Sequence, residues 1–295
     1  MDRKPDTSNR SWKTLDLLNE ASSFFASKGM EGPRLQAELL LAAALDLKRL
    51  ELYLQFEKIL TPQQVEVFRG FVRERLKGSP VQYVTGTAAF RNLELCVGSG
   101  VLIPRPETEI VVEVALELLA AQDGERILDL GCGSGAIAIA ICSERPTVRA
   151  IASDIDRVAL SIAADNAQRH DVTDRVALVC GDLLEPFTGG SAQLDAIISN
   201  PPYIASAEIQ ALQPEVRDFE PHRALDGGAD GLEFYRRIAD SSTDLLAQGG
   251  AMVLEVGDDQ APAVMGLLEE SDAYDQIEAR CDLSGTERVV CCRRR

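Results

Sequence analysis

The stretch ILDLGCGSGAIA, residues 127–138, decides the fold. Its first half is a short apolar run typical of a buried strand, and its second half opens a helix-like run, GAIAIAICS. Between the two halves, Gly131, Gly133 and Gly135 form a G-x-G-x-G pattern. Glycines let the chain turn sharply and let a ligand touch the backbone. The order of strand, glycine turn and helix predicts an α/β unit that binds a ligand at the turn, although dinucleotide sites share this pattern.

Strand-like and helix-like runs alternate around this stretch, from about residue 103 to the C-terminus. Because the strand-like runs are almost continuously apolar, the alternation indicates a mostly parallel sheet covered by helices on both faces. This is an α/β, Rossmann-like architecture. We expect strands at 126–130, 148–154, 175–182, 194–199 and 251–256, helices at 135–143, 158–170, near 231–247 and near 259–270, and two strands at the C-terminus.

The first 78 residues have a different pattern, which predicts a small helical bundle. Leu15 and Leu18 recur at helical spacing, and Gly29 follows the expected end of that helix. The segment Thr61-Pro62-Gln63-Gln64 is typical of a helix start, with a threonine cap and a glutamine three residues later. We see no catalytic constellation in residues 1–78, and we expect this domain to dock a substrate.

Residues 79–102 change character again and predict a β-hairpin that links two domains. Leu93, Leu95 and Val97 alternate with their neighbours as in a strand, and Arg91-Asn92 is a candidate turn. The expected organisation is therefore a helical domain at 1–78, a hairpin linker at 79–102 and a Rossmann-like domain at 103–295.

The net charge of −17 is unevenly distributed. Residues 1–78 hold 13 Lys and Arg against 11 Asp and Glu, whereas residues 79–295 hold 17 against 36. A strongly acidic body repels a phosphate backbone, so we expect no direct nucleic-acid partner.

The cysteines, the histidines and the hydropathy exclude several other classes of protein. The seven cysteines include no C-x-x-C pair, and we expect reduced, buried thiols rather than disulfides or zinc ligands. Since the only histidines are His170 and His222, we expect no metal site. No apolar run is long enough to cross a membrane, and the polar residues 1–10 lack the core of a signal peptide. We therefore expect no membrane partner and a cytoplasmic location.

Three aspartates stand at or near the ends of successive predicted strands. The carboxylate of Asp129, two residues before the first glycine, can bind a cationic amine and would repel a pyrophosphate. Asp154 ends the next strand, where an acidic residue binds ribose hydroxyls. Asp182 ends the third strand, where it can meet an adenine amino group while Leu183 packs on the ring. Helix capping explains any one of them, but the set fits S-adenosylmethionine, which has an amino-acid tail, a ribose, an adenine and no phosphate.

The segment SNPPYI, residues 199–204, follows the fourth strand of this domain and predicts where the chemistry takes place. An amide or exocyclic amino nitrogen is a poor nucleophile because its lone pair is delocalised. Two acceptors can hold its N–H groups and turn the lone pair toward a methyl group: the Asn200 side-chain oxygen and the Pro201 carbonyl oxygen. The Pro-Pro backbone is rigid and adds no competing donor. Tyr203 offers a flat face on which the planar group can stack.

With these motifs the sequence resembles the class I S-adenosylmethionine-dependent methyltransferases, and Asn-Pro-Pro-Tyr resembles the motif of those that act on planar amino groups. The whole chain is similar to the release factor glutamine methyltransferase family (the HemK/PrmC group). The resemblance covers about residues 10–292 and rests on PVQYVTGTAAF at 80–90, IPRPETE at 103–109, EPHRALDGGADGLEFYRRI at 220–238 and SGTERVV at 284–290.

The resemblance implies a fold, a reaction and a set of site residues. The fold is a Rossmann-like domain preceded by a helical bundle and a hairpin. The reaction is methyl transfer to the side-chain nitrogen (N5) of the glutamine in the Gly-Gly-Gln motif of class I peptide chain release factors. The implied cofactor contacts are Gly131, Cys132, Gly133, Ser134, Gly135, Asp154, Leu183 and Asn200, and the implied glutamine contacts are Asn200, Pro201, Pro202 and Tyr203.

The roles of three further residues are hypotheses. We expect Arg105 and Glu107 to line the entrance for cofactor or substrate, with a surface salt bridge as the alternative. Phe90 is expected to form a wall of the glutamine slot, with a place in the core as the alternative.

Other functions remain open at this point. A related enzyme methylates a glutamine of a ribosomal protein, but its junction resembles PRSP more than the PRPET found at residues 104–108. A nucleic-acid amino-methyltransferase (adenine N6 or guanine N2) shares Asn-Pro-Pro-Tyr, but it needs a basic surface. A binding module without chemistry and a dehydrogenase are weaker alternatives, since the intact glycine turn opposes the first and Asp129 and Asn200 fit the second poorly.

Overall fold

The computed structural model describes residues 11–119, 124–188 and 193–295, and it divides into two compact units, Met1–Gly86 and Thr87–Arg295. Residues 1–10 lie outside the described residues. They are the first part of the expected 1–78 domain and the segment to which the expectation about a signal peptide refers.

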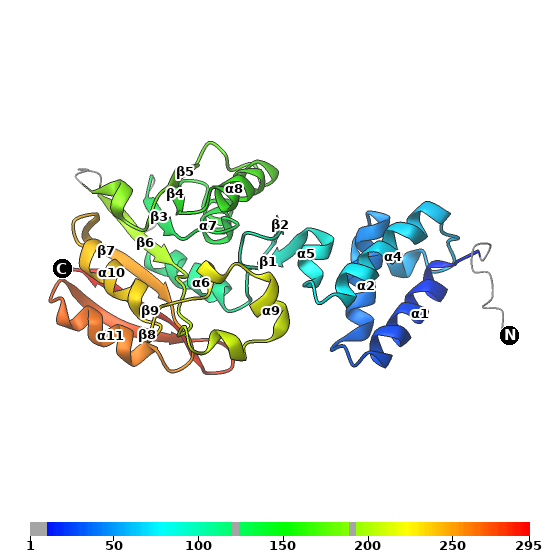
Figure 1. Cartoon of the computed structure of the whole chain (residues 1–295). Helices are drawn as coiled ribbons and strands as arrows, with labels where there is room; N and C mark the ends of the chain where they lie inside the picture. The colour runs from blue at the N-terminus through cyan, green and yellow to red at the C-terminus, as the bar shows by residue number, and fades with distance from the viewer. Residues whose placement is uncertain (1–10, 120–123, 189–192) are drawn as a thin grey trace. The chain divides into compact units, whose positions relative to one another are not determined.

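The N-terminal unit is helical, as its sequence predicts (Figure 1). Its helices are α1 (Thr14–Ser27), α2 (Pro33–Leu45), α3 (Arg49–Leu54), α4 (Pro62–Leu76) and α5 (Val81–Thr85). The predicted start of α4 is confirmed, because the Thr61 hydroxyl accepts the Gln64 N–H at 3.2 Å and the Gln64 side chain accepts the Thr61 N–H at 3.0 Å. Phe25, Leu41 and Phe68 are buried in the core that these helices enclose.

The predicted hairpin is present, but it is shorter than expected. Strands β1 (Thr87–Phe90) and β2 (Leu93–Cys96) pair antiparallel around the turn at Arg91-Asn92. Residues 81–85, expected in an extended region, instead form helix α5 in the first unit. The hairpin is part of the second unit, where the Asn166 side chain of α8 bonds to both the N–H and the carbonyl of Cys96, at 2.6 and 3.0 Å.

The second unit contains a seven-stranded sheet in the order β5-β4-β3-β6-β7-β9-β8, parallel except for β9, which pairs antiparallel with both neighbours. Its strands are β3 (Arg126–Leu130), β4 (Arg149–Asp154), β5 (Val176–Cys180), β6 (Leu194–Ser199), β7 (Leu246–Glu255), β8 (Tyr274–Cys281) and β9 (Glu287–Arg294). Its helices are α6 (Thr108–Leu118), α7 (Ala136–Glu144), α8 (Arg157–Arg169), α9 (Pro214–Phe219), α10 (Glu233–Ser241) and α11 (Ala261–Glu270). Short 3₁₀ turns occupy Glu185–Phe187, Ile209–Ala211 and His222–Ala224.

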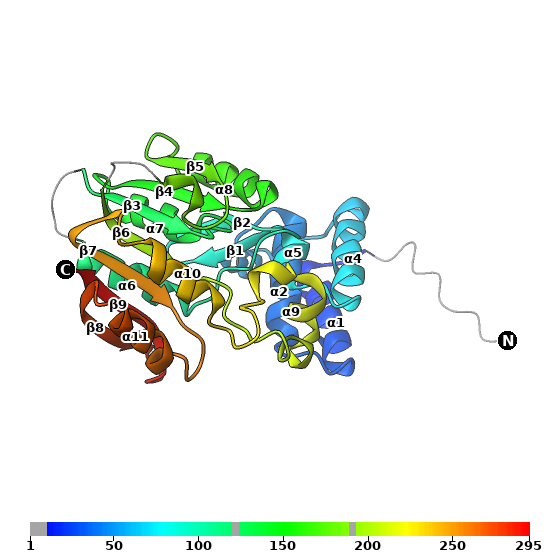
Figure 2. The same ribbon diagram turned by 60° about the vertical axis from the view of Figure 1, so that its left-hand side comes forward.

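Two apolar cores cover the two faces of this sheet (Figures 1 and 2). Helices α6, α7 and α8 pack on one face, while α10 and α11 pack on the other. Strand β3 supplies both cores, because Ile127 faces the first and Leu128 and Leu130 face the second. Such burial explains why the central strands are almost continuously apolar.

The predicted strands and helices of this unit are largely confirmed, and three differences affect the site. Helix α6, which begins at Thr108, was not among the expected helices. Short helix α9 was also not expected. Strand β7 begins at Leu246, inside the region expected to be helical up to about 247.

All seven cysteines are free thiols. Cys132, Cys142, Cys291 and Cys292 are buried as expected, whereas Cys180 and Cys281 are exposed.

Gly135 shows why the last glycine of the turn is required for packing. Its φ of +80° is a left-handed conformation, and an added Cβ would lie 2.9 Å from Ile139 Cδ1 and 3.2 Å from Ala163 Cβ. The glycine therefore lets α7 and α8 approach one another closely behind the turn.

Gly135→Ala should lower the free energy of unfolding by about 1–3 kcal/mol, because the new methyl group overlaps two helices and the backbone is strained. Urea unfolding followed by circular dichroism measures this change. Gly98→Ala is the matched control: no described atom beyond its chain neighbours lies within 4 Å of the added carbon, and the change should stay within about 0.5 kcal/mol. Equal effects at both positions would contradict the packing role.

Candidate active site

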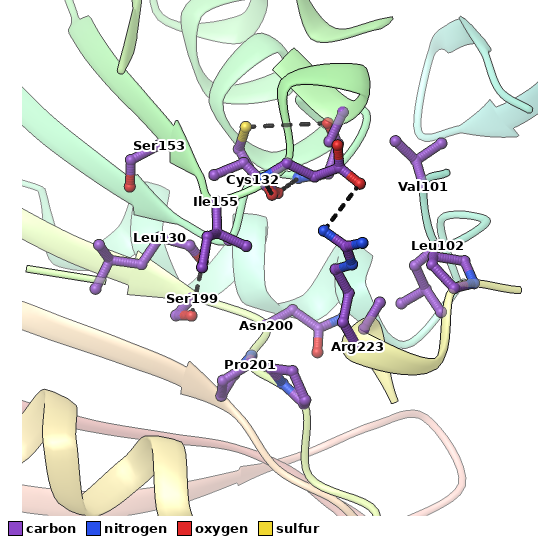
Figure 3. Close-up of a pocket in the computed structure, with 18 of the residues that line it drawn as sticks. Val101, Leu102, Leu130, Cys132, Ser153, Ile155, Ser199, Asn200, Pro201 and Arg223 are labelled. Carbon is purple, nitrogen blue, oxygen red and sulfur yellow. Dashed lines mark hydrogen bonds and ion pairs between the residues drawn. The ribbon is translucent and has the colours of Figure 1, made fainter. Parts of the chain in front are cut away.

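A cavity of about 450 Å³ lies at the carboxyl edge of the parallel strands (Figure 3). This volume is in the range of small-molecule sites, and open α/β sheets bind ligands at this edge. The cavity is lined by the glycine turn after β3, the ends of β4 and β6 and residues 181–183 after β5. Further lining residues are Pro221, Arg223, Ala224 and two residues of α10, Phe234 and Arg237. Figure 3 shows Asn200 and Pro201 across the cavity from Cys132 and Ile155.

The glycine turn is held by the end of β4. Asp154 accepts the Gly133 N–H through Oδ2 at 2.9 Å and the Asp156 N–H through Oδ1 at 2.8 Å, and burial raises its pKa. A Cβ added at Gly131 or Gly133 would meet no described atom within 4 Å, and both glycines line the cavity. The backbone of the turn is therefore open to a ligand on this side.

Asp129 lies behind the turn rather than in the cavity lining. Its side chain is fully buried, Oδ2 accepts the Ala138 N–H at 3.1 Å, and Oδ1 has no hydrogen-bond partner among the described residues. Burial raises the pKa of this carboxyl to about 7. The position of the Asp129 side chain therefore gives no support to the expected direct contact with a ligand amine.

Asp182 and Leu183 do line the cavity, and Asp182 has a partner that the sequence did not reveal. Its Oδ2 lies 2.7 Å from Nη2 of Arg237, which also lies over the Phe234 ring at 5.9 Å. A second ion pair in the lining joins Arg223 and Asp156 at 3.2 Å. The two arginines and Phe234 fall within the 220–238 segment, which was noted as a motif without individual roles.

Ile155 is a further lining residue that the sequence motifs did not indicate. It follows Asp154 and is 57% exposed, although it is a large apolar side chain. The available sequence signal is an isoleucine directly after Asp154, beyond the end of the expected strand 148–154.

Asn200 is oriented by two residues that are distant in sequence. Its side-chain Nδ2 donates to the Thr108 hydroxyl at 3.1 Å, and that hydroxyl donates to Glu255 Oε2 at 2.6 Å. No described donor bonds to Asn200 Oδ1 or to the Pro201 carbonyl, and both residues line the cavity. The site thus offers two acceptors side by side along the chain.

The segment after β6 is held in place by a glycine-rich loop. Ile204 donates its N–H to the Leu225 carbonyl at 3.0 Å and accepts the Gly227 N–H at 2.8 Å. A Cβ at Gly227 would lie 2.8 Å from the Pro202 carbonyl oxygen and from Tyr203 Cα, so only glycine permits this contact. Pro202 lines the cavity, whereas the Tyr203 side chain packs against the core on the α10–α11 face.

Three of the hypothetical site residues lie outside the cavity lining. Phe90 is 1% exposed and belongs to the core on the α6–α8 face. Arg105 forms an ion pair with the buried Glu220, which also accepts the Ile103 N–H at 3.2 Å. Glu107 lies at the start of α6 and lines a separate groove.

Comparison with known proteins identifies the family. Residues 16–86 match the PrmC N-terminal domain, and residues 105–215 match the methyltransferase small domain. The chain is 41% identical, over 98% of both chains, to the release factor glutamine methyltransferase of Geobacter sulfurreducens. This chain belongs to the release factor glutamine methyltransferase family. The family member from Chlorobaculum tepidum is 42% identical over 95% of this chain and 97% of its own.

The fold agrees with this membership, so the predicted family and the predicted fold class are confirmed. A crystal structure of a methyltransferase from Pyrococcus furiosus matches with a TM-score of 0.51 at 17% identity, over 70% of this chain and 90% of that chain. No helix among the described residues is long and apolar enough to cross a membrane.

The buried Asp129 should make stability depend on pH. Its pKa is about 7 when folded and near 3.8 when exposed, so the folded state binds more protons and stability falls as the pH rises through this window. Between pH 5 and pH 8, the loss should be on the order of 2 kcal/mol. Asp129→Asn should remove this part of the decline, as measured by urea unfolding at each pH.

The exposed Asp16, changed to Asn, is the matched control and should keep the wild-type decline. An undiminished decline in Asp129→Asn would contradict the pKa assigned to this carboxyl.

Proposed function

We propose that this protein transfers a methyl group from S-adenosylmethionine to the side-chain amide nitrogen (N5) of the glutamine in the Gly-Gly-Gln motif of class I peptide chain release factors. Family membership supports the reaction class, since the relatives are named release factor glutamine methyltransferases. The observation that carries the proposal is the pair of unpaired acceptors, Asn200 Oδ1 and the Pro201 carbonyl, beside the cavity of the glycine turn.

The residues around the cavity fit S-adenosylmethionine. The open side of Gly131 and Gly133 leaves room for the methionine part against the backbone of the turn, with Cys132 and Ser134 beside it. The Asp154 oxygens each accept one backbone N–H and keep lone pairs for ribose hydroxyls.

Two further groups complete the proposed cofactor site. Ile155 and Leu183 supply apolar surface for the adenine, and Asp182 lies near its edge in an ion pair with Arg237. Asp129 acts on a cationic cofactor through its charge from behind the turn, not through contact.

The reaction needs an orientation that two acceptors can impose. S-adenosylmethionine supplies an electrophilic methyl group on a sulfonium. Asn200 Oδ1 and the Pro201 carbonyl each accept one N–H of the substrate carboxamide, which turns the nitrogen lone pair toward that methyl. The nitrogen–methyl bond forms as the sulfur–methyl bond breaks, and the amide nitrogen then loses a proton. No general base is needed before transfer, because the methylated cation is a strong acid.

The remaining expected residues support the site indirectly in this proposal. Pro202 and Tyr203 keep the Pro-Pro backbone in place against the 225–231 loop. The ion pair of Arg105 with Glu220 ties the segment before α6 to the segment before the 222–224 turn. Phe90 anchors the hairpin in the core, and the Glu107 carbonyl accepts the Ile110 N–H at 3.1 Å in the first turn of α6, the helix that carries Thr108.

The proposed substrate also suggests how the Gly-Gly-Gln loop reaches the site and what the N-terminal domain does. The two glycines of Gly-Gly-Gln let a loop extend and place its glutamine in a narrow slot. We propose that the N-terminal domain docks the body of the release factor. Since release factors act on ribosomes, we place the reaction in the cytoplasm.

The acidic charge of residues 79–295 favours a protein substrate over a nucleic acid, because a phosphate backbone would be repelled. A glutamine of a ribosomal protein remains an alternative substrate that the same two acceptors could hold.

The test is to incubate the protein with methyl-labelled S-adenosylmethionine and a purified class I release factor, and then to locate the label by mass spectrometry. We expect one methyl group on the Gly-Gly-Gln glutamine. Asn200→Ala should lower the transfer rate by about 100-fold or more, because one of the two orienting acceptors is lost. Asn92→Ala, at the exposed turn of the hairpin, is the matched control and should retain the wild-type rate.

Label on a ribosomal protein or on nucleic acid, with none on the release factor, would overturn the substrate while leaving the cofactor site intact. Absence of S-adenosylmethionine binding by calorimetry would overturn the cofactor.

A further inference from the structure

A buried chain of hydrogen bonds connects a carboxyl group to the side chain of Asn200. Glu255 ends β7 and is 2% exposed, and Thr108 begins α6 and is 4% exposed. The Glu255 Oε2 to Thr108 Oγ1 distance is 2.6 Å, and the Thr108 Oγ1 to Asn200 Nδ2 distance is 3.1 Å. The three residues come from three separate elements, so the fold has brought them together specifically at the cavity.

The direction of this chain follows from the number of protons available. An ionised Glu255 can only accept, so the single hydroxyl proton of Thr108 points to it. The Thr108 oxygen can then only accept from Asn200, which requires the NH₂ half of the carboxamide. The other half, Asn200 Oδ1, is left as the acceptor toward the cavity.

Protonation gives the Glu255 carboxyl a proton to donate, which makes the opposite direction available to the whole chain of hydrogen bonds. The carboxylic acid then donates to the Thr108 oxygen, and the Thr108 hydroxyl proton turns toward Asn200. The Asn200 carboxamide then rotates, so that its oxygen accepts from Thr108 and its NH₂ faces the cavity. A donor then faces the N–H of an incoming amide, where the reaction requires an acceptor.

We propose that Glu255 and Thr108 are positioning residues that set which end of the Asn200 carboxamide faces the substrate, and that the protonation of Glu255 switches the Asn200 side chain from presenting its acceptor oxygen to presenting its donor NH₂. The importance of this switch for catalysis rests on the proposed function. The reorientation of Asn200 depends only on the hydrogen bonds between Glu255, Thr108 and Asn200.

The surroundings of Glu255 place the switch near neutral pH. Burial raises the pKa of Glu255 to about 7, the Thr108 bond lowers it, and Glu107 at the start of α6 raises it further. Arg288 of β9 and Arg105 of the segment before α6 favour the ionised form.

Two tyrosines also lie around Glu255. Tyr203 faces it from the segment after β6, and Tyr235 of α10 donates its hydroxyl to the Glu255 backbone carbonyl at 2.8 Å. Burial raises the pKa of Tyr203, so this phenol stays neutral through the range in question.

The chain allows a direct test because it has only five asparagines, at positions 9, 19, 92, 166 and 200. Protein labelled with ¹⁵N-asparagine gives five side-chain NH₂ pairs in an NMR correlation spectrum, and Asn200→Ala identifies the Asn200 pair by its loss. We expect the Asn200 pair to shift between pH 6 and pH 8 with a midpoint of about 7. Thr108→Val and Glu255→Gln should abolish this shift, and Thr108→Ser should retain it.

Thr14→Val is the matched control, because Thr14 is a fully buried threonine of the N-terminal unit whose hydroxyl bonds to the Lys58 carbonyl at 3.3 Å. It should leave the Asn200 titration unchanged. The NH₂ pair of Asn166, which donates to the Cys96 and Ser134 carbonyls at 3.0 and 2.9 Å, reports whether each variant is folded. An Asn200 pair that does not titrate would overturn the proposal. A pair that titrates equally in Thr108→Val would also overturn it, because the pH response would then not pass through Thr108.

Transfer kinetics give the second measurement. In the wild type, kcat should fall about 10-fold for each pH unit below the midpoint. Thr108→Val should lower kcat by about 100-fold at pH 8, remove this acidic limb and leave the dissociation constant of S-adenosylmethionine within about 3-fold. An Asn200 titration without methyl transfer to any release factor would refute the proposed function but support the switch. Methyl transfer whose acidic limb is the same in Thr108→Val would support the proposed function but refute the switch.

Discussion

The parallel pairing of β3, β4, β6 and β7 at their carboxyl ends is the constraint on which the site depends. Leu130 pairs with Ser153 on one side and with Ser199 on the other, and Ser199 pairs with Leu254. The next residue of each strand or turn therefore stands at the same level of the sheet edge: Gly131, Asp154, Asn200 and Glu255. A one-residue slip in any pair would turn these side chains to the opposite face.

Two of the groups at this edge are costly to bury. Burial raises the pKa values of the Asp129 and Glu255 carboxyls to about 7. Each of them therefore lowers the free energy of unfolding of the protein as the pH rises toward neutrality. Apolar residues would stabilise the sheet more at both positions. A raised pKa close to a ligand cavity is typical of functional sites, and here one carboxyl lies behind the glycine turn and the other controls Asn200 through Thr108.

The sequence predicted the parts of the structure that local pattern controls. The apolar runs gave β3, β4, β5 and β6, and the spacing of the glycines gave the turn, because strand burial and backbone conformation are local requirements. The contacts of Asn200 could not be predicted in this way, since Thr108 lies 92 residues away and Glu255 lies 147 residues beyond Thr108. Helix α6 was missed together with Thr108, and no local pattern links Asp182 to Arg237, 55 residues later.

The most direct test is a crystal structure with S-adenosylhomocysteine and a Gly-Gly-Gln peptide. The account predicts that the glutamine side-chain nitrogen donates to both Asn200 Oδ1 and the Pro201 carbonyl, with the sulfur of the cofactor product in line beyond that nitrogen. A glutamine bound elsewhere, or an Asn200 whose nitrogen faces the peptide at pH 8, would contradict it.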